Sequence, residues 1–108
     1  MTLEEIYTVL NGISGFEGKV AYRAFPEGHA PALPFICYLA PYSHNVFADG
    51  EVYKTINHIQ IELYSRTKDV TSESLLEAAL NRAGLPWEKT EDYLDDERCF
   101  QVIYETEV

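Results

Sequence analysis

His58 and Glu62 come closest, of all the residues in the chain, to a pattern that could perform chemistry. They lie four residues apart in the stretch from Val52 to Ser65, which alternates like a strand and so turns both side chains to one face. A histidine oriented by a carboxylate is a common general base. The same pattern is typical of the solvated face of an ordinary strand, which is the interpretation we favour. A small enzyme that uses His58 and Glu62 remains one functional hypothesis.

No other residues have the spacing of a catalytic, metal or nucleotide site. Ser14 lies in GISGF, which lacks the second glycine of the G-x-S-x-G nucleophile elbow. The nearby glycines do not follow a strand, as those of a nucleotide-binding loop do. The histidines lack zinc-ligand spacing, and the acidic residues from Asp92 to Glu97 lack the glycine of an EF-hand loop. The sequence therefore predicts no catalytic residue, no metal ligand and no cofactor.

Size and charge narrow the class of protein further. The chain has 108 residues, 46% of them hydrophobic, which predicts one domain over residues 1–108. A net charge of −10 argues against sequence-specific binding of DNA or RNA, which needs a basic surface. No apolar run approaches the ~20 residues of a membrane helix, and the acidic start does not resemble a secretory signal. We therefore expect a cytosolic protein that does not bind membranes, with Cys37 and Cys99 as free thiols in strands.

The stretch from Val52 to Ser65 is the element around which the others must be arranged. Ile59, Ile61 and Leu63 form its apolar face, and β-branched and aromatic residues dominate it. We expect the central strand of a small sheet. Roughly 45 Å at full extension is long for so small a domain, so part of the strand should project beyond the compact core.

The residues before this strand predict a helix and two strands. Thr2 and Glu5 form a capping-box pattern at the start of a helix from Thr2 to Leu10, and Asn11-Gly12 should end it in a left-handed cap. The strands should cover Lys19 to Phe25 and Phe35 to Tyr42. Pro41 should mark an edge, a bulge or the strand's end.

A hairpin loop is expected from Ser43 to Glu51, with Asp49-Gly50 as its turn signal. Apolar residues at a loop tip either fold back onto the core or meet a partner, and we favour a partner. Strand tyrosines are typical both of half-buried packing and of interfaces. The predicted interface comprises Val46, Phe47, Asp49, Val52 and Tyr53.

The rest of the chain predicts a second helix and a final hairpin. The helix should run from Ser72 to Ala83, capped by Thr71 or Ser72 and ended by Gly84. The hairpin should pair residues 87–94 with residues 99–107. The order α-β-β-β-α-β-β then indicates an α+β fold, with an antiparallel or mixed sheet of about five strands and two helices packed on one face.

Acidic residues concentrate in the last part of the chain. Residues 88–108 hold eight acids and two bases. This pattern is typical of a solvated surface, or of a surface that repels nucleic acid or faces a basic partner. A second functional hypothesis is therefore an acidic protein-binding module, such as an inhibitor that mimics nucleic acid. The acidic residues expected to face a channel or a partner are Glu91, Asp92, Asp95, Asp96 and Glu97.

The succession of phrases along the chain resembles a known family. APALPFICYL, IQIELYS, NRAGLPWEKTEDYLDDE and QVIYETEV, in this order, look like the small tail-completion or tail-terminator proteins of long-tailed bacteriophages and prophages. The resemblance implies a ring, commonly of six subunits, that caps the tail tube and meets the head-completion proteins without catalysing a reaction. It also implies a protein made in the bacterial cytoplasm that becomes part of the virion. A non-enzymatic tail protein is our leading hypothesis.

Overall fold

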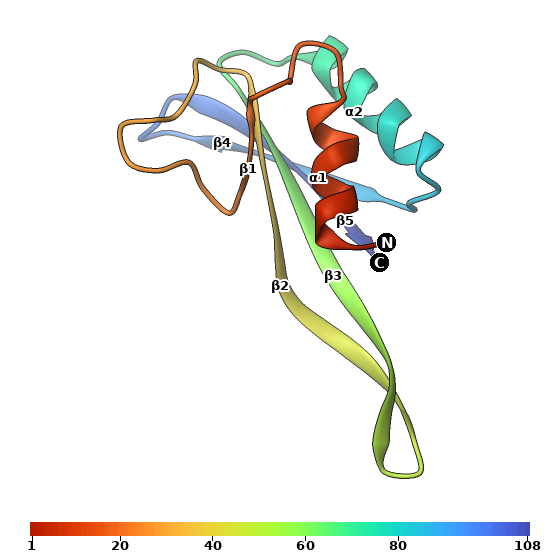
Figure 1. The fold of residues 1–108 in the computed structure, drawn as a ribbon. Coiled ribbons are helices and arrows are strands. Elements are labelled where there is room, and N and C mark those ends of the chain that lie inside the picture. The colour runs from red at the N-terminus through yellow and green to blue at the C-terminus, as the bar shows by residue number, and fades with distance from the viewer.

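The computed structural model describes all 108 residues and contains two helices and one five-stranded sheet. The strands lie in the order β1-β2-β3-β5-β4, and β1 is parallel to β2 while every other pair is antiparallel. Both helices lie on one side of the sheet (Figure 1). The predicted α+β fold and element order are confirmed. The elements are α1 (Leu3–Asn11), β1 (Val20–Tyr22), β2 (Phe35–Ala48), β3 (Glu51–Ser65), α2 (Val70–Arg82), β4 (Glu88–Leu94) and β5 (Cys99–Glu107).

β3 occupies the middle of the sheet, as predicted. Ile59, Ile61 and Leu63 are fully buried against the helices, where Leu76 and Leu80 of α2 are also fully buried. Removing such side chains from water is the main source of stability in a small domain. The opposite face of the sheet has no helix on it, and we call it the outer face.

Helix α1 begins as predicted and ends differently. The Thr2 hydroxyl accepts a hydrogen bond from the Glu5 amide at 3.1 Å, and Glu5 accepts one from the Thr2 amide at 2.9 Å. The predicted left-handed cap is wrong, because Gly12 has a right-handed φ of −80°. The chain continues in a tight right-handed turn, in which the Ile13 amide donates to Leu10, and this turn buries Ile13 in the core.

The first two strands have different lengths from those predicted. β1 covers only Val20–Tyr22, because Arg23 has a positive φ of 65° and its amide donates to the Tyr38 carbonyl, which turns the chain away. β2 continues to Ala48, so most of the predicted loop is strand.

The turn residues explain the longer strand. Asp49 and Gly50 both have positive φ, and a two-residue turn of this kind matches the twist of two strands that continue up to it. Pro41 lies at a shift of the register between Leu39 and Tyr42, so of the three alternatives predicted for it, the bulge is the one that matches.

Helix α2 starts earlier than predicted and with another cap. Asp69 is its N-cap, because its side chain accepts from both the amide and the hydroxyl of Ser72. The helix therefore begins at Val70, and the predicted caps Thr71 and Ser72 lie inside it. Gly84 follows the helix with a φ of 74°, the left-handed conformation expected of it.

An ion-pair network joins α2 to the sheet. Glu73, whose side chain is 5% exposed, pairs with Lys68 at 2.6 Å and with Lys89 of β4 at 3.2 Å. Glu77 accepts from Lys89 at 2.6 Å and from the Tyr104 hydroxyl of β5 at 2.7 Å. Hydrogen bonds to Glu77, then to Glu73, raise the pKa of Lys89 against the effect of its burial. The helix is thus held by charge as well as by its apolar stripe.

The C-terminal hairpin and the free thiols are confirmed. β4 pairs over its full length with residues 99–105 of β5, around the turn at residues 95–98. Cys37 and Cys99 are both free and buried, and burial raises the pKa of the Cys37 thiol to about 11. No helix has the length and apolar character needed to cross a membrane.

Candidate functional site

A two-stranded ribbon projects from the sheet. β1 pairs with β2 only as far as Tyr38, and β5 pairs with β3 only from His58 onward, so residues 43–56 have no third strand beside them. We call these residues the arm. The arm extends away from the helices (Figure 1), and the molecule measures 50 × 28 × 23 Å. An isolated two-stranded ribbon is marginally stable in water. Burial within this chain therefore does not account for the apolar residues of the arm.

The structure gathers the predicted interface residues at the tip of the arm. Phe47 lies opposite Val52, and Val46 lies opposite Lys54, with Tyr53 as the extra residue at a shift in register. The four apolar side chains are 45% to 76% exposed, and Asp49 forms the turn beyond them. A cluster of exposed apolar residues is typical of a contact surface. Whether a partner binds here stays a prediction.

The root of the arm is held by aromatic and polar contacts that the sequence did not reveal. The ring of Tyr42 stacks on that of His58, with 4.6 Å between centroids and 7° between planes. The His58 Nε2 lies 3.0 Å from Glu105, and the His44 Nε2 lies 2.7 Å from Glu107. These contacts tie both strands of the arm to β5, so the arm leaves the body in a defined direction.

The predicted pair of His58 with Glu62 does not form. His58 contacts Glu105 instead, and Glu62 accepts a hydrogen bond from the Tyr64 hydroxyl at 3.1 Å. Residues four apart on a strand share a face but stand ~13 Å apart, and β5 brings Glu105 closer. Burial raises the pKa of Glu62, while the bond from Tyr64 opposes the rise.

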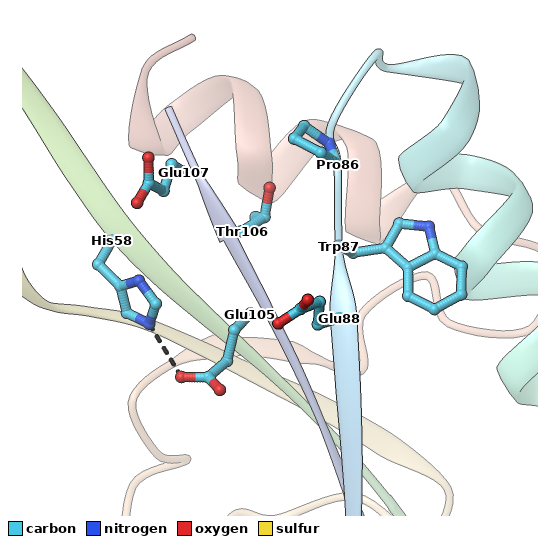
Figure 2. Close-up of a pocket in the computed structure, with 7 residues that line it drawn as sticks. All are labelled: His58, Pro86, Trp87, Glu88, Glu105, Thr106 and Glu107. Carbon is cyan, nitrogen blue, oxygen red and sulfur yellow. Dashed lines mark hydrogen bonds and ion pairs between the residues drawn. The ribbon is translucent and has the colours of Figure 1, made fainter.

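An open depression of about 460 Å³ lies beside His58 (Figure 2). Figure 2 shows Trp87 turned away from His58, and its indole N–H donates to Asn81 of α2. With one face stacked on Tyr42 and Nε2 on Glu105, His58 serves to hold the arm's root. No group of three or more His, Cys, Asp or Glu side chains is placed to hold a metal ion. The depression is lined by His58, Pro86, Trp87, Glu88, Glu105, Thr106 and Glu107.

The predicted acidic residues do not form one surface. Glu91 and Asp92 are neighbours on β4, so they point to opposite faces of the sheet. Glu91 pairs with Lys68 at 2.6 Å, and the Asp92 carboxylate accepts from the Tyr93 amide. The others, Asp95, Asp96 and Glu97, lie exposed in the turn between β4 and β5 and make no salt bridge.

A second apolar surface lies on the outer face and was missed by the sequence reasoning. It is a shallow groove of about 330 Å³ near the β4–β5 turn. The rings of Phe35 and Tyr64 pack in it, with centroids 5.2 Å apart. Its residues come from a loop, a turn and four strands, so no local pattern in the sequence marks it. The groove is lined by Leu33, Phe35, Tyr64, Leu94, Glu97 and Cys99.

No protein-family model matches the chain, and neither a curated protein nor a solved structure matches it. The likeness to tail-terminator proteins therefore depends on the sequence phrases alone and stays a prediction. Three features of the surface remain as candidates for a functional role: the arm, the groove and the turn at residues 95–98, which we call the acidic turn.

Proposed function

We propose that this protein is a non-enzymatic structural subunit of a phage or prophage tail, which assembles with copies of itself into a ring at the head–tail junction. The observation that carries the proposal is the arm. It displays Phe47 and Tyr53, which are 66% and 76% exposed, on a ribbon that no other part of the chain covers. Aromatic side chains at the centre of a contact dominate binding energy in protein interfaces.

The edges of the sheet support the same role. β1 and β4 are its edge strands, and β2 is unpaired on one side beyond Tyr38. Unpaired backbone N–H and C=O groups on such edges are ready to pair with another chain. The ring, commonly of six subunits, and its meeting with tail-tube and head-completion proteins come from the family resemblance.

The acidic turn has a separate part in the proposal. Asp95, Asp96 and Glu97 would face the channel or a partner, and carboxylates in a channel would repel the phosphates of passing DNA. Asp95→Lys combined with Asp96→Lys should slow DNA passage without preventing assembly. Passage at the wild-type rate in virions that carry both changes would argue against this part.

Sedimentation velocity over a wide concentration range tests the assembly itself. The wild-type protein should form oligomers as its concentration rises, alone and with tail-tube protein. A variant in which Asn-Gly replaces residues 44–56 should fold and remain monomeric, because the turn can close the strands at the cross-strand pair Ser43 and Asn57. A wild-type protein that stays monomeric under every condition would refute the proposal.

The acidic turn also favours a second candidate, a module that binds a basic protein by mimicking nucleic acid. The dependence of binding on salt concentration distinguishes the two candidate functions. Binding through the turn should weaken steeply as salt rises, because exposed charges are screened. Association through the apolar arm should depend much less on salt.

A further inference from the structure

The chain exposes two apolar surfaces at opposite ends of the same pair of strands. The groove lies where Phe35 pairs with Tyr64, and the arm tip lies where Phe47 pairs with Val52. Twelve residues of strand separate these pairs along β2, which amounts to ~40 Å. In Figure 1 the arm tip and the β4–β5 turn, beside which the groove lies, are at opposite ends of the molecule. The arm cannot reach the groove of its own chain.

The groove matches the arm tip in size and chemistry. A cavity of about 150 Å³ holds one benzene-sized ring, so the 330 Å³ of the groove is enough space for Phe47 and Tyr53 together. Five of its six lining residues are hydrophobic, and Phe25 packs edge-on against Phe35 beside it at 5.1 Å. Aromatic residues that enter such a lining can adopt the tilted contacts already present there.

Charges of both signs border each surface, so opposite charges can meet across the contact. Asp49 and Glu51 flank the tip of the arm, and two exposed arginines lie beside the groove, Arg66 directly after β3 and Arg98 directly before β5. Lys54 adjoins Tyr53 on the arm, while Glu97 lines the groove next to Asp95 and Asp96. Two arms that paired with each other would bring Asp49 and Glu51 of one copy close to the same residues of the other. Repulsion between like charges disfavours that arrangement.

We propose that the arm tip of one copy binds in the outer-face groove of the next copy, with Phe47 and Tyr53 as its anchors. The inference rests on the proposed self-assembly and names the surface that receives the arm. Because the two surfaces differ and lie at opposite ends, the contact is head-to-tail, the kind that forms a ring when the rotation between neighbouring copies closes.

Mixing two complementary variants tests the contact by sedimentation velocity. The arm variant carries Phe47→Ser and Tyr53→Ser, and the groove variant carries Leu94→Glu. The dissociation constant for self-association of each variant should rise at least ~30-fold, which is the effect of removing a binding hot spot. The equimolar mixture should form a one-to-one heterodimer and nothing larger, because one intact arm then meets one intact groove.

Controls keep the result interpretable. Val70→Ser removes a 61% exposed apolar side chain at the start of α2, away from both surfaces, and should assemble like the wild type. Leu33→Gln, in the loop beside the groove, replaces Leu94→Glu if circular dichroism shows that the latter does not fold.

The outcomes separate the inference from the proposed function. Groove variants that assemble like the wild type, while the arm variant does not, would overturn the groove and leave arm-mediated assembly intact. A mixture that contains only monomers would also overturn the groove. An arm variant that assembles normally, or a wild-type protein that never associates, would overturn both.

Discussion

The body and the arm are built from the same two strands and differ in what covers them. In the body, Ile59 to Leu63 of β3 lie under two helices, and Ile59, Ile61 and Leu63 have no exposed surface. In the arm, Tyr53 is 76% exposed. Whether the apolar residues of a strand are buried therefore depends on whether helices cover that part of the sheet. The body buries its apolar residues within the chain, whereas those of the arm remain exposed to solvent.

The comparison also explains where charge matters. Around α2, carboxylates and lysines meet at a partly buried seam and hold the helix on the sheet. At the root of the arm, His44 and His58 pair with Glu107 and Glu105 of β5 and hold the ribbon's direction. One network stabilises the fold, and the other positions a surface.

The largest expected difference concerns apolar side chains in the two regions. Ile61→Ala should lower the free energy of unfolding by about 3 to 4 kcal/mol, because it leaves a cavity in the core. Tyr53→Ala should change it by less than ~0.5 kcal/mol, since the side chain contacts mainly water. Urea denaturation of the monomer measures both. Equal losses would mean that the arm belongs to the folded core.

The ion-pair network should give the next largest effect. Glu73→Ala should cost about 2 kcal/mol, because it leaves a buried site beside two lysines whose pairs are lost. Glu97→Ala, at an exposed turn position without a salt bridge, is the matched control and should cost less than ~0.5 kcal/mol. The urea midpoints of the two variants provide the test, and similar midpoints would contradict a structural role for Glu73.

Tyr42 should affect the arm more than the body. Tyr42→Ala removes the ring stacked on His58, which should cost about 1 kcal/mol locally and speed exchange of the arm's backbone amides roughly fivefold. Hydrogen exchange followed by NMR resolves the two regions. Faster exchange at Ile61 and Leu63 as well would show that the arm and the body open together.

The smallest expected effect depends on pH. Burial raises the pKa of Glu62 in the folded protein, so ionising this carboxyl costs stability at pH 7 and the cost disappears as pH falls below its ordinary pKa of 4.5. Glu62→Gln should therefore be slightly more stable than the wild type at pH 7 and equal to it near pH 4. Glu88→Gln, at an exposed position, is the matched control. A gain that persists at pH 4 would contradict burial as the cause.

Local patterns determined much of this molecule. The alternation of Ile59, Ile61 and Leu63, the capping box of Thr2 with Glu5 and the turn at Asp49-Gly50 each depend on residues close together in the chain. Their energies are local, so the element order and the position of the arm's tip could be predicted.

Tertiary structure decided the rest. β2 continues to Ala48 because β3 pairs with it, although the residues from Ser43 to Ala48 have the composition of a loop. Glu105 replaces Glu62 beside His58 because β5 lies next to β3. The groove exists only where a loop, a turn and four strands meet. Contacts between distant segments depend on how the helices and strands pack against one another. The spacing of residues along the chain does not indicate which distant segments will meet.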